Sequence, residues 1–410
     1  MGHDLGGRAG DPRALDGASP FRDAGALGGV AAHVTVPDGV ADAAPPELPT
    51  IYDVARLAGV SIASVSRVLN GSRNPRQETR DRVLQAVMDL GFVPDGAARA
   101  LSARMKEVVG VVVRRPRWHA NDLFADEDDN LQFPDMINRG MEIVAQRHGF
   151  DLLIRSVAVD EPNPAQRIFT LARKSDGIIL HDRVLSPAEL ARLARQLPVV
   201  TLAGEPTPET ANVHSDNATG MRELARHLID DHDYRTIAFL AGHAGSPDSL
   251  SRGRALAKEA SASGVTLLRG EAWRGSYQAA AGARAIDRLI ASGVQLPEAI
   301  VCANDQSAIG VLHALAQHGI SVPGDVAVTG FDDIPVARHL RPQLTSVRQS
   351  IQDMGATAFE TLYSMIAGEP GRDGGDARGR DIALPTRLVR RESCGCGPQS
   401  RPSHDEQEAK

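Results

Sequence analysis

A nine-residue segment in the first quarter of the chain carries side chains suited to contacting the edges of DNA bases. Residues 61–69 are SIASVSRVL, and their apolar members recur at helical spacing, which predicts a helix with one buried face. Ile62, Ala63 and Arg67 fall on the other face. Arginine can donate two hydrogen bonds to a guanine, and small or apolar side chains allow close approach to a thymine methyl group. We therefore predict that this helix reads bases in a major groove.

Side chains that can donate hydrogen bonds to phosphate oxygens surround the same segment. Such donors, together with the amides at a helix N-terminus, position a protein on the DNA backbone without reading its sequence. The candidates are Thr50, Ser61, Ser64, Ser66 and Asn70.

Three short helices are predicted to position these residues. Thr50 and Asp53 have the T-x-x-D spacing of a capping box, which places Thr50 at the N-cap of the first helix. Gly59 lies in a tight turn, and Ser61 caps the second helix. Two short helices joined by a glycine-containing turn and supported by a third form a helix-turn-helix. The predicted helices cover 51–57 and 62–69, and the third begins at Asn74-Pro75, a polar cap followed by proline.

A connector follows this module. The stretch 96–101 is predicted to form a very short helix, which is marginal in water on its own. Such a helix could fold only on DNA, with Leu101 as an apolar wedge in the minor groove that kinks the duplex. Alternatively, Leu101 is a simple linker residue that packs against the next domain.

The charge distribution separates this module from the rest of the chain. Residues 50–106 hold nine Lys or Arg and five Asp or Glu, so their net charge is 9 − 5 = +4. The whole chain of 410 residues carries −7, which leaves −11 for the remainder. A small basic module on a large acidic body is typical of a DNA-binding head attached to another domain.

Cysteine usage and hydropathy predict a cytoplasmic protein. The three cysteines, Cys302, Cys394 and Cys396, are too few for a disulfide scaffold and suit a reducing compartment. No run approaches the roughly 18 apolar residues of a membrane span, and the N-terminus lacks the pattern of a secretory signal. Cys394-Gly395-Cys396 has no second pair nearby, so we interpret it as two tail thiols and assign no metal ligand and no cofactor.

The termini have compositions typical of disorder. Residues 1–49 are rich in Gly, Ala, Pro and Asp, and are predicted to be a disordered extension or a misassigned start. The predicted boundaries are 1–49 for the extension, 50–94 for the helix-turn-helix domain, 95–106 for hinge and linker, 107–393 for a two-lobed domain, and 394–410 for a disordered tail.

The large domain alternates apolar strands with amphipathic helices, which is typical of βαβ units and parallel sheets. About 285 residues exceed one comfortable sheet, so two α/β lobes are expected. The predicted strands are 108–113, 151–154, 177–180, 198–202, 236–240, 300–303 and 325–329. The predicted helices are 135–147, 187–196, 218–230, 277–291 and 307–317.

Residues 50–104 resemble the DNA-binding head and hinge of the LacI family, the bacterial repressors typified by the lactose repressor. The resemblance lies in the phrases YDVARLAGVSIASVSRVLNG, TRDRV and GFVPDGAARALSAR. It implies a homodimer on a pseudopalindromic operator, base contacts from Ile62, Ala63 and Arg67, and paired Leu101 side chains that open a central base step. Carried over onto these phrases, the DNA-contacting set also includes Tyr52, Thr79 and Ala98.

The resemblance continues over residues 108–393, through SDGIIL, HSDN, ANDQSAIGVLHAL, SVPGDVAVTGFDD, LTSVRQ and LVRRES. It implies a core similar to periplasmic sugar-binding proteins, with two α/β lobes, a cleft and three crossovers. We expect the first lobe to hold about 107–210 with a return near 340–350, and the second to hold about 211–337 and 351–393.

A cleft of this kind would bind a small effector, most simply a sugar, through bidentate polar groups and an aromatic face. Arg252 follows a strand and loop, in a spacing that resembles the family's pattern. Asn304 and Asp332 follow the strands 300–303 and 325–329 at their carboxyl ends, where ligands of such folds bind. The effector-binding candidates are Phe133, Arg252, Trp273, Asn304 and Asp332, whereas Asp305 is expected to cap a helix and Trp273 could instead fill the core.

These observations predict a transcriptional regulator, most simply a repressor, whose operator affinity is controlled allosterically by a metabolite. One alternative is a solute-binding protein for transport, which leaves the basic head unexplained. The other is a sugar-metabolising enzyme, which the missing G-x-S-x-G, P-loop and dinucleotide-binding motifs disfavour.

Overall fold

The computed structural model describes residues 49–69, 75–93, 105–115, 132–158, 161–181, 184–368 and 377–397. The chain divides into two compact units, Met1–Val93 and Pro94–Lys410. The predicted hinge helix, with Ala98 and Leu101, lies outside the described residues, as does Asn70. No helix of the described residues is long and apolar enough to cross a membrane.

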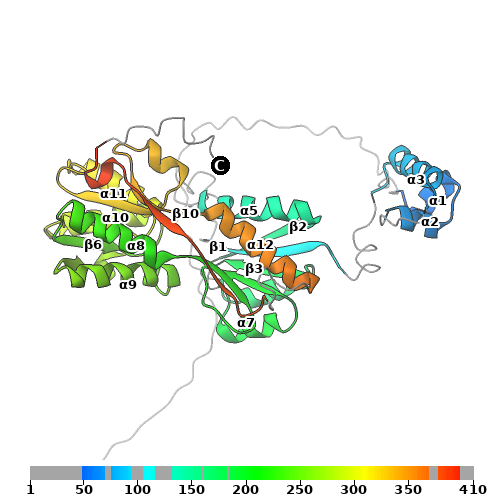
Figure 1. Ribbon diagram of the computed structural model, residues 1–410, viewed down its shortest axis with the longest axis horizontal. Coiled ribbons are helices and arrows are strands. Elements are labelled where there is room, and N and C mark those ends of the chain that lie inside the picture. The colour runs from blue at the N-terminus through cyan, green and yellow to red at the C-terminus, as the bar shows by residue number, and fades with distance from the viewer. Residues whose placement is uncertain are drawn as a thin grey trace, which may run out of the picture. The chain divides into compact units, whose positions relative to one another are not determined.

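The first unit contains a packed three-helix head (Figure 1). Thr50 donates from its backbone N–H and its hydroxyl to the Asp53 carboxylate, at 2.9 and 2.6 Å, which fixes the start of the first helix as predicted. Gly59 ends that helix at φ 63°, a left-handed conformation that glycine adopts without steric cost. The helices are α1 (Ile51–Ala58), α2 (Ile62–Leu69) and α3 (Gln77–Leu90), and their buried core includes Val54, Ala58, Val65, Val68, Val83 and Phe92.

The third helix begins later than the sequence suggested. Gln77 is its first residue and Arg76 occupies the N-cap, in an extended conformation with ψ 149°. Proline restricts φ but not ψ, so Pro75 can precede the helix instead of starting it. Asn74, the predicted cap, lies outside the described residues.

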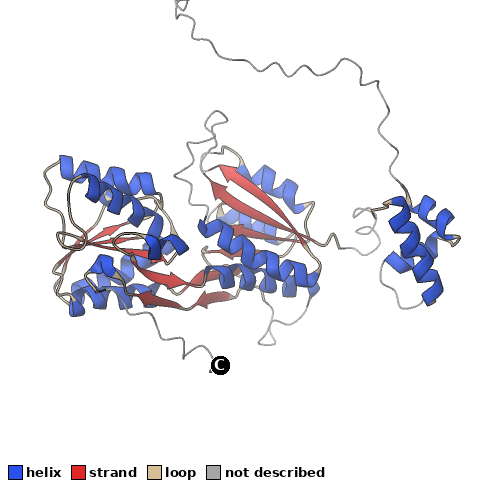
Figure 2. Cartoon of the chain, turned by 90° about the horizontal axis from the view of Figure 1, so that it is seen from above, coloured by secondary structure: helices blue, strands red, loops and turns tan. Residues whose placement is uncertain are grey.

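The second unit contains two six-stranded sheets, each flanked by helices (Figure 2). In the first sheet the order is β11-β5-β4-β3-β1-β2 and every neighbouring pair is parallel. In the second the order is β12-β10-β9-β8-β6-β7, and β12 runs antiparallel to β10. The first sheet comprises β1 (Val108–Arg115), β2 (Asp151–Ala158), β3 (Gly177–His181), β4 (Val199–Leu202), β5 (Ala211–Ser215) and β11 (Asp381–Leu384). The second comprises β6 (Thr236–Leu240), β7 (Thr266–Leu268), β8 (Ala299–Cys302), β9 (Ala327–Asp332), β10 (Thr345–Gln349) and β12 (Thr386–Val389).

Helices cover both sheets, as expected where successive parallel strands of a sheet are connected through helices. The first lobe carries α5 (Gln132–His148), α6 (Pro164–Ala172), α7 (Pro187–Ala194) and α12 (Ile351–Ala367). The second carries α8 (Asn217–Arg226), α9 (Pro247–Ala262), α10 (Ala279–Ala291) and α11 (Asp305–Gln317). One turn of π-helix, His227–Asp231, extends α8.

The expected division of the chain between the lobes was wrong, although three crossovers do connect them. β5 belongs to the first sheet and β10 to the second, and the chain returns to the first lobe with α12 and β11 before β12 leaves it again. The crossovers therefore lie at 215–217, 349–351 and 384–386. The lobe to which a strand belongs depends on its pairing with strands distant in the sequence, and local periodicity does not indicate that pairing.

The predicted tail was also wrong for its first residues. Cys394 ends a short 3-10 helix (Glu392–Cys394) and is fully buried in the second lobe. The segment is fixed because Ser393 bonds to Gln343, Thr345 and Val328 through its backbone and hydroxyl. Residues 398–410 lie outside the described chain.

Two glycines allow α5 and α12 to pack backbone to backbone (Figure 1). A Cβ atom added at Gly140 would lie 1.9 Å from the carbonyl oxygen of Gln352, and one at Gly355 would lie 2.0 Å from that of Ile137. Because both obstacles are backbone, no side-chain rotation can relieve the overlap.

We predict that Gly140→Ala lowers the free energy of unfolding by about 2–4 kcal/mol, because the helices must separate. Helix propensity alone would give the opposite sign, a gain of about 1 kcal/mol. Urea denaturation of the variant and of the exposed same-helix control Gln146→Ala measures the difference. A stability equal to or above wild type would show that the α5–α12 interface tolerates a wider spacing.

Candidate functional sites

The outer face of α2 presents the predicted base-reading residues. Ile62 is 42% exposed, and Ala63 and Arg67 are also exposed, while Val65 and Val68 on the other face are buried in the head. The Ser61 hydroxyl accepts from the Ser64 amide at 3.2 Å, so it caps the helix. The local fold thus holds these three side chains on a rigid, accessible helix face.

The other predicted DNA contacts of the head vary in exposure. Tyr52 is 68% exposed on α1, an unusual position for a large aromatic side chain that serves only the packing of the head. Thr50 is exposed as well, whereas Ser64, Ser66 and Thr79 are half-buried.

A second group of polar side chains gathers at the carboxyl ends of the strands in the second lobe. Arg252 on α9 is only 3% exposed. Its guanidinium donates to the Asn217 side-chain oxygen at 2.8 Å and to the Ala303 carbonyl at 2.6 Å, and it lies 3.6 Å from the centre of the Phe331 ring. Asp248, one turn earlier on the helix, is 3.7 Å away. A buried arginine requires such partners because it cannot lose its charge.

A chain of hydrogen bonds joins this group to the first lobe. Gln349, at the end of β10, donates to the Asp332 carboxylate at 2.5 Å, and Ser215, at the end of β5, donates to the Gln349 oxygen at 2.5 Å. All three side chains are buried, and both Ser215 and Gln349 stand at crossovers. A change in the relative position of the lobes would therefore alter these contacts.

Backbone strain coincides with the same group. Asp332 and Asp333 at the end of β9 have φ values of 119° and 55°, and Tyr277 has 66°. Non-glycine residues rarely adopt these conformations, which concentrate at binding sites where surrounding contacts hold them.

The expected role of Asp305 as a helix cap was wrong. Asn304 occupies the N-cap, where its side-chain oxygen accepts from the Ser307 amide at 3.0 Å, and its amide donates to the Tyr277 carbonyl. Asp305 lies inside the helix, and its carboxylate accepts from the Ile334 amide and the Ser346 hydroxyl. The predicted effector contact Asn304 thus has a structural role in this conformation.

The two predicted aromatics differ from the polar group. Trp273 is 5% exposed and packs in a hydrophobic cluster of the second lobe, the arrangement of a core residue. Phe133 is half-buried at the start of α5, at the edge of the first-lobe core. Contact of either ring with an effector stays a prediction.

Several members of the polar group were not among the residues predicted from the sequence: Ser215, Asn217, Asp248 and Gln349. Asn217 belongs to the HSDN phrase, and Asp248 stands four residues before Arg252, so both had a signal. Gln349 ends the LTSVRQ phrase, but its place beside Asp332 depends on which sheet β10 joins.

Comparisons with family models agree with both units. Residues 50–95 match the model of bacterial regulatory proteins of the lacI family, and residues 225–394 match the periplasmic binding protein-like domain. The chain is 33% identical to the HTH-type transcriptional regulator GalS of Salmonella typhimurium, over 84% of this chain and 96% of that protein. It is 32% identical to the HTH-type transcriptional regulator GalR of Escherichia coli, over 78% of this chain and 90% of that one.

Solved structures share the fold. A lac repressor dimer bound to operator and an anti-inducer superposes with a TM-score of 0.70 at 23% identity, covering 84% of this chain and 99% of that one. A complex of the transcriptional regulator CelR with cellobiose gives a TM-score of 0.58 at 28% identity, with the same coverage.

The buried carboxyl of Asp332 predicts a pH dependence of stability. Burial raises its pKa to about 7, although Arg252 and Gln349 oppose the rise. The folded state therefore keeps a proton that the unfolded chain, with a pKa near 3.8, has released, so stability falls as pH rises from about 4 to about 7. We expect Asp332→Asn to reduce this pH-dependent loss in the free energy of unfolding by an amount on the order of a few kcal/mol.

Urea midpoints of wild type and variant between pH 4 and 8 measure this effect. The exposed strand residue Asp151 provides the control Asp151→Asn, which should keep the wild-type slope. Parallel pH profiles of wild type and Asp332→Asn would contradict the assignment.

Proposed function

The chain belongs to the LacI family of bacterial regulatory proteins, and we propose that it is a cytoplasmic repressor that a sugar releases from, or locks onto, a pseudopalindromic operator. It is a DNA-binding transcriptional regulator, as its relatives are, and not an enzyme. The observation that carries the proposal is the exposed face of α2, where Ile62, Ala63 and Arg67 stand on a helix with a fully packed opposite side.

The proposed recognition uses the geometry of a helix-turn-helix. α2 enters the major groove, Arg67 donates both branches of its guanidinium to a guanine, and Ile62 and Ala63 contact neighbouring base edges. Hydroxyl groups of the head hold the phosphates. The supporting set is Thr50, Tyr52, Ser61, Ser64, Ser66, Asn70 and Thr79.

A homodimer would place two heads on the two halves of the operator. In the proposed complex, Ala98 and Leu101 of each hinge lie in the minor groove at the centre of the site, and the two leucines unstack one base step. A solved relative with the same fold is a dimer on its operator, which is consistent with this assembly.

The proposed effector site lies between the lobes at the polar group of the second. Arg252 and Asp332 offer a donor fork and an acceptor, a set suited to the vicinal hydroxyl groups of a sugar. The 28%-identical CelR binds cellobiose, which supports this ligand class. Asn304, Trp273 and Phe133 complete the proposed contacts once the lobes adjust around the ligand.

Allosteric control would operate through the crossovers. A ligand that bridges the lobes favours one arrangement of Ser215, Gln349 and Asp332 over another, and so shifts the population between two lobe arrangements. In a dimer the shift changes the distance between the two heads. The alternative is a solute-binding protein for transport, which would leave the exposed α2 face without a function.

The direct test is selection of duplexes from a random pool with the full-length chain. We expect an enriched sequence with two inverted half-sites, bound by a dimer. Recovery of no enriched sequence, with binding that depends on salt alone, would reject sequence-specific regulation.

Arg67→Ala and Arg67→Lys distinguish base reading from phosphate contact. We expect both variants to lose about 1–3 kcal/mol of binding free energy on the selected DNA and little on random DNA. Lysine keeps the positive charge but cannot donate the paired hydrogen bonds of the guanidinium. Titration at fixed salt measures both affinities. If Arg67→Lys restores full affinity, Arg67 contacts only phosphate.

Arg252→Ala tests the effector site. After a thermal-shift screen identifies a binding sugar, we expect the variant to lose about 2 kcal/mol or more of sugar affinity while it still binds selected DNA. Calorimetry on the variant and on Arg254→Ala, an exposed neighbour on α9, provides the comparison. Unchanged sugar affinity in Arg252→Ala would place the effector elsewhere.

A further inference from the structure

Four potential metal ligands from two distant parts of the chain meet in the second lobe. The tetrad consists of His227, His232, Cys394 and Cys396, whose donor atoms all lie within 4.8 Å of one another. His227 and Cys394 are buried, and the other two are half-buried. The prediction of two tail thiols rested on the lack of a second ligand pair nearby, since 162 or more residues separate the cysteines from these histidines.

Four of the six distances between donor atoms of the tetrad match tetrahedral zinc. Bond lengths of about 2.3 Å to sulfur and 2.0–2.1 Å to nitrogen require nitrogen–sulfur separations of about 3.6 Å and a nitrogen–nitrogen separation of about 3.3 Å. The His227 Nε2 atom lies 3.3 Å from Cys394 Sγ, 3.6 Å from Cys396 Sγ and 3.2 Å from His232 Nε2. His232 Nε2 lies 3.5 Å from Cys396 Sγ.

Hydrogen bonding alone does not account for this convergence. The Nδ1 atom of His227 lies 2.8 Å from the Asp231 carboxylate, so it carries the proton that this contact needs. In a neutral ring Nε2 then has one lone pair, which can accept from only one of its three neighbours, and a protonated Nε2 has one N–H for the same three neighbours. A cation at the centre satisfies all four atoms together.

We propose that the tetrad binds a structural Zn²⁺ ion that ties the C-terminal segment to the end of α8. Four protein ligands leave no open coordination position, which is typical of a structural rather than a catalytic site. The ion would hold the segment after β12 on the second lobe, where the Ser393 hydroxyl already accepts from the Thr345 amide and donates to the Val328 carbonyl.

Local backbone features serve this arrangement. The π-helical turn His227–Asp231 brings residues five apart onto one side, where an α-helix would rotate them away from each other. Gly395, between the two cysteines, has φ 103°, and a Cβ atom there would lie 3.3 Å from the His232 ring. A side chain at this position would therefore crowd the second histidine.

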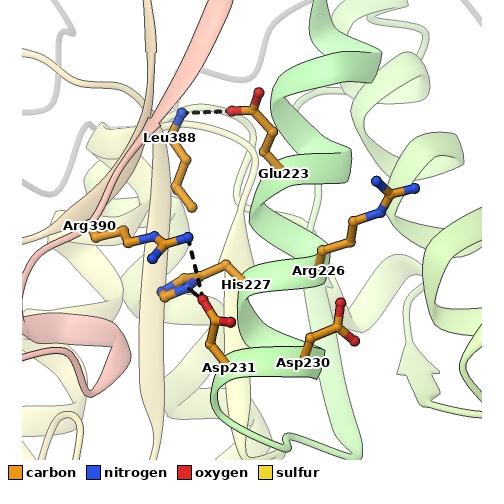
Figure 3. A pocket seen from close by; sticks show the side chains of 7 residues that line it. All are labelled: Glu223, Arg226, His227, Asp230, Asp231, Leu388 and Arg390. Carbon is orange, nitrogen blue, oxygen red and sulfur yellow. Dashed lines mark hydrogen bonds and ion pairs between the residues drawn. The ribbon is translucent and has the colours of Figure 1, made fainter.

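The surroundings of the tetrad have the pattern of outer ligands around a metal site. Asp231 orients the His227 ring and also pairs with Arg390 at 3.4 Å, as Figure 3 shows. Carboxylate–histidine pairs of this type orient zinc ligands and raise their basicity. The Thr345 hydroxyl donates to Cys394 Sγ at 3.1 Å. A cavity of about 340 Å³ lies beside His227 and is lined in part by Asp230 and Asp231.

Metal content and competition with a chromophoric chelator test the proposal on the full-length chain, purified without a polyhistidine tag. We expect about one zinc per chain in wild type. Cys396→Ser should weaken zinc binding at least about 100-fold, and Asp231→Asn about 10–100-fold through the outer contact. His318→Ala, an exposed histidine paired with Asp287 elsewhere in the lobe, is the matched control and should bind as wild type does.

Two further measurements separate binding from folding. With chelator present, wild type and Cys396→Ser should melt together, and added zinc should raise the melting temperature of wild type only. Cobalt substitution should give the visible bands of tetrahedral thiolate coordination. Equal zinc affinity in wild type and Cys396→Ser, absence of sulfur-to-cobalt bands, or a Cys394–Cys396 disulfide in protein prepared under reductant would overturn the proposal.

Discussion

A guanidinium that cannot be neutralised stands at the centre of the large domain. Because Arg252 is buried at the strand ends of the second lobe, every group around it must compensate for lost hydration. The Ala303 carbonyl fixes the end of β8, Asn217 fixes the start of α8, and the Phe331 ring covers the cation from β9. One buried charge therefore fixes β8, α8 and β9 relative to one another. The same contacts surround the strained backbone at Asp332 and hold it in place.

The contacts of the Arg252 cluster within the second lobe differ in strength from those that join it to the first lobe. Within the second lobe the contacts of Arg252 are short and enclosed, whereas this cluster is joined to the first lobe through single hydrogen bonds from Gln349 and Ser215, beside the packing of Ile334 against the first-lobe core. The bond from Ser215 to Gln349 joins two neutral groups and contributes about 1 kcal/mol, far less than the enclosed cation requires. In the proposed allosteric mechanism the contacts between the lobes would change, while the enclosed contacts of Arg252 would stay.

Features encoded by local patterns were predictable from the sequence, and those that depend on distant pairing were not. The α2 face followed from periodicity within nine residues, and β6 has the predicted bounds. β5 and β10 were missed because ANVHS and TSVRQ are short and partly polar, and they become strands only beside distant partners. Arg252 was found from its place after a strand, whereas Gln349 and the meeting of His227 with Cys394 depend on the complete topology.

The interleaving of the two lobes has a consequence for biosynthesis. β5 is complete at residue 215, but its outer neighbour β11 and the covering helix α12 emerge from the ribosome only after residue 351. During the intervening elongation, the apolar faces later covered by Phe359 and Leu362 remain open, while the second lobe is still being translated. Nascent chains of this architecture consequently expose an apolar surface from the completion of β5 until α12 is synthesised, and aggregation during translation is favoured in that interval.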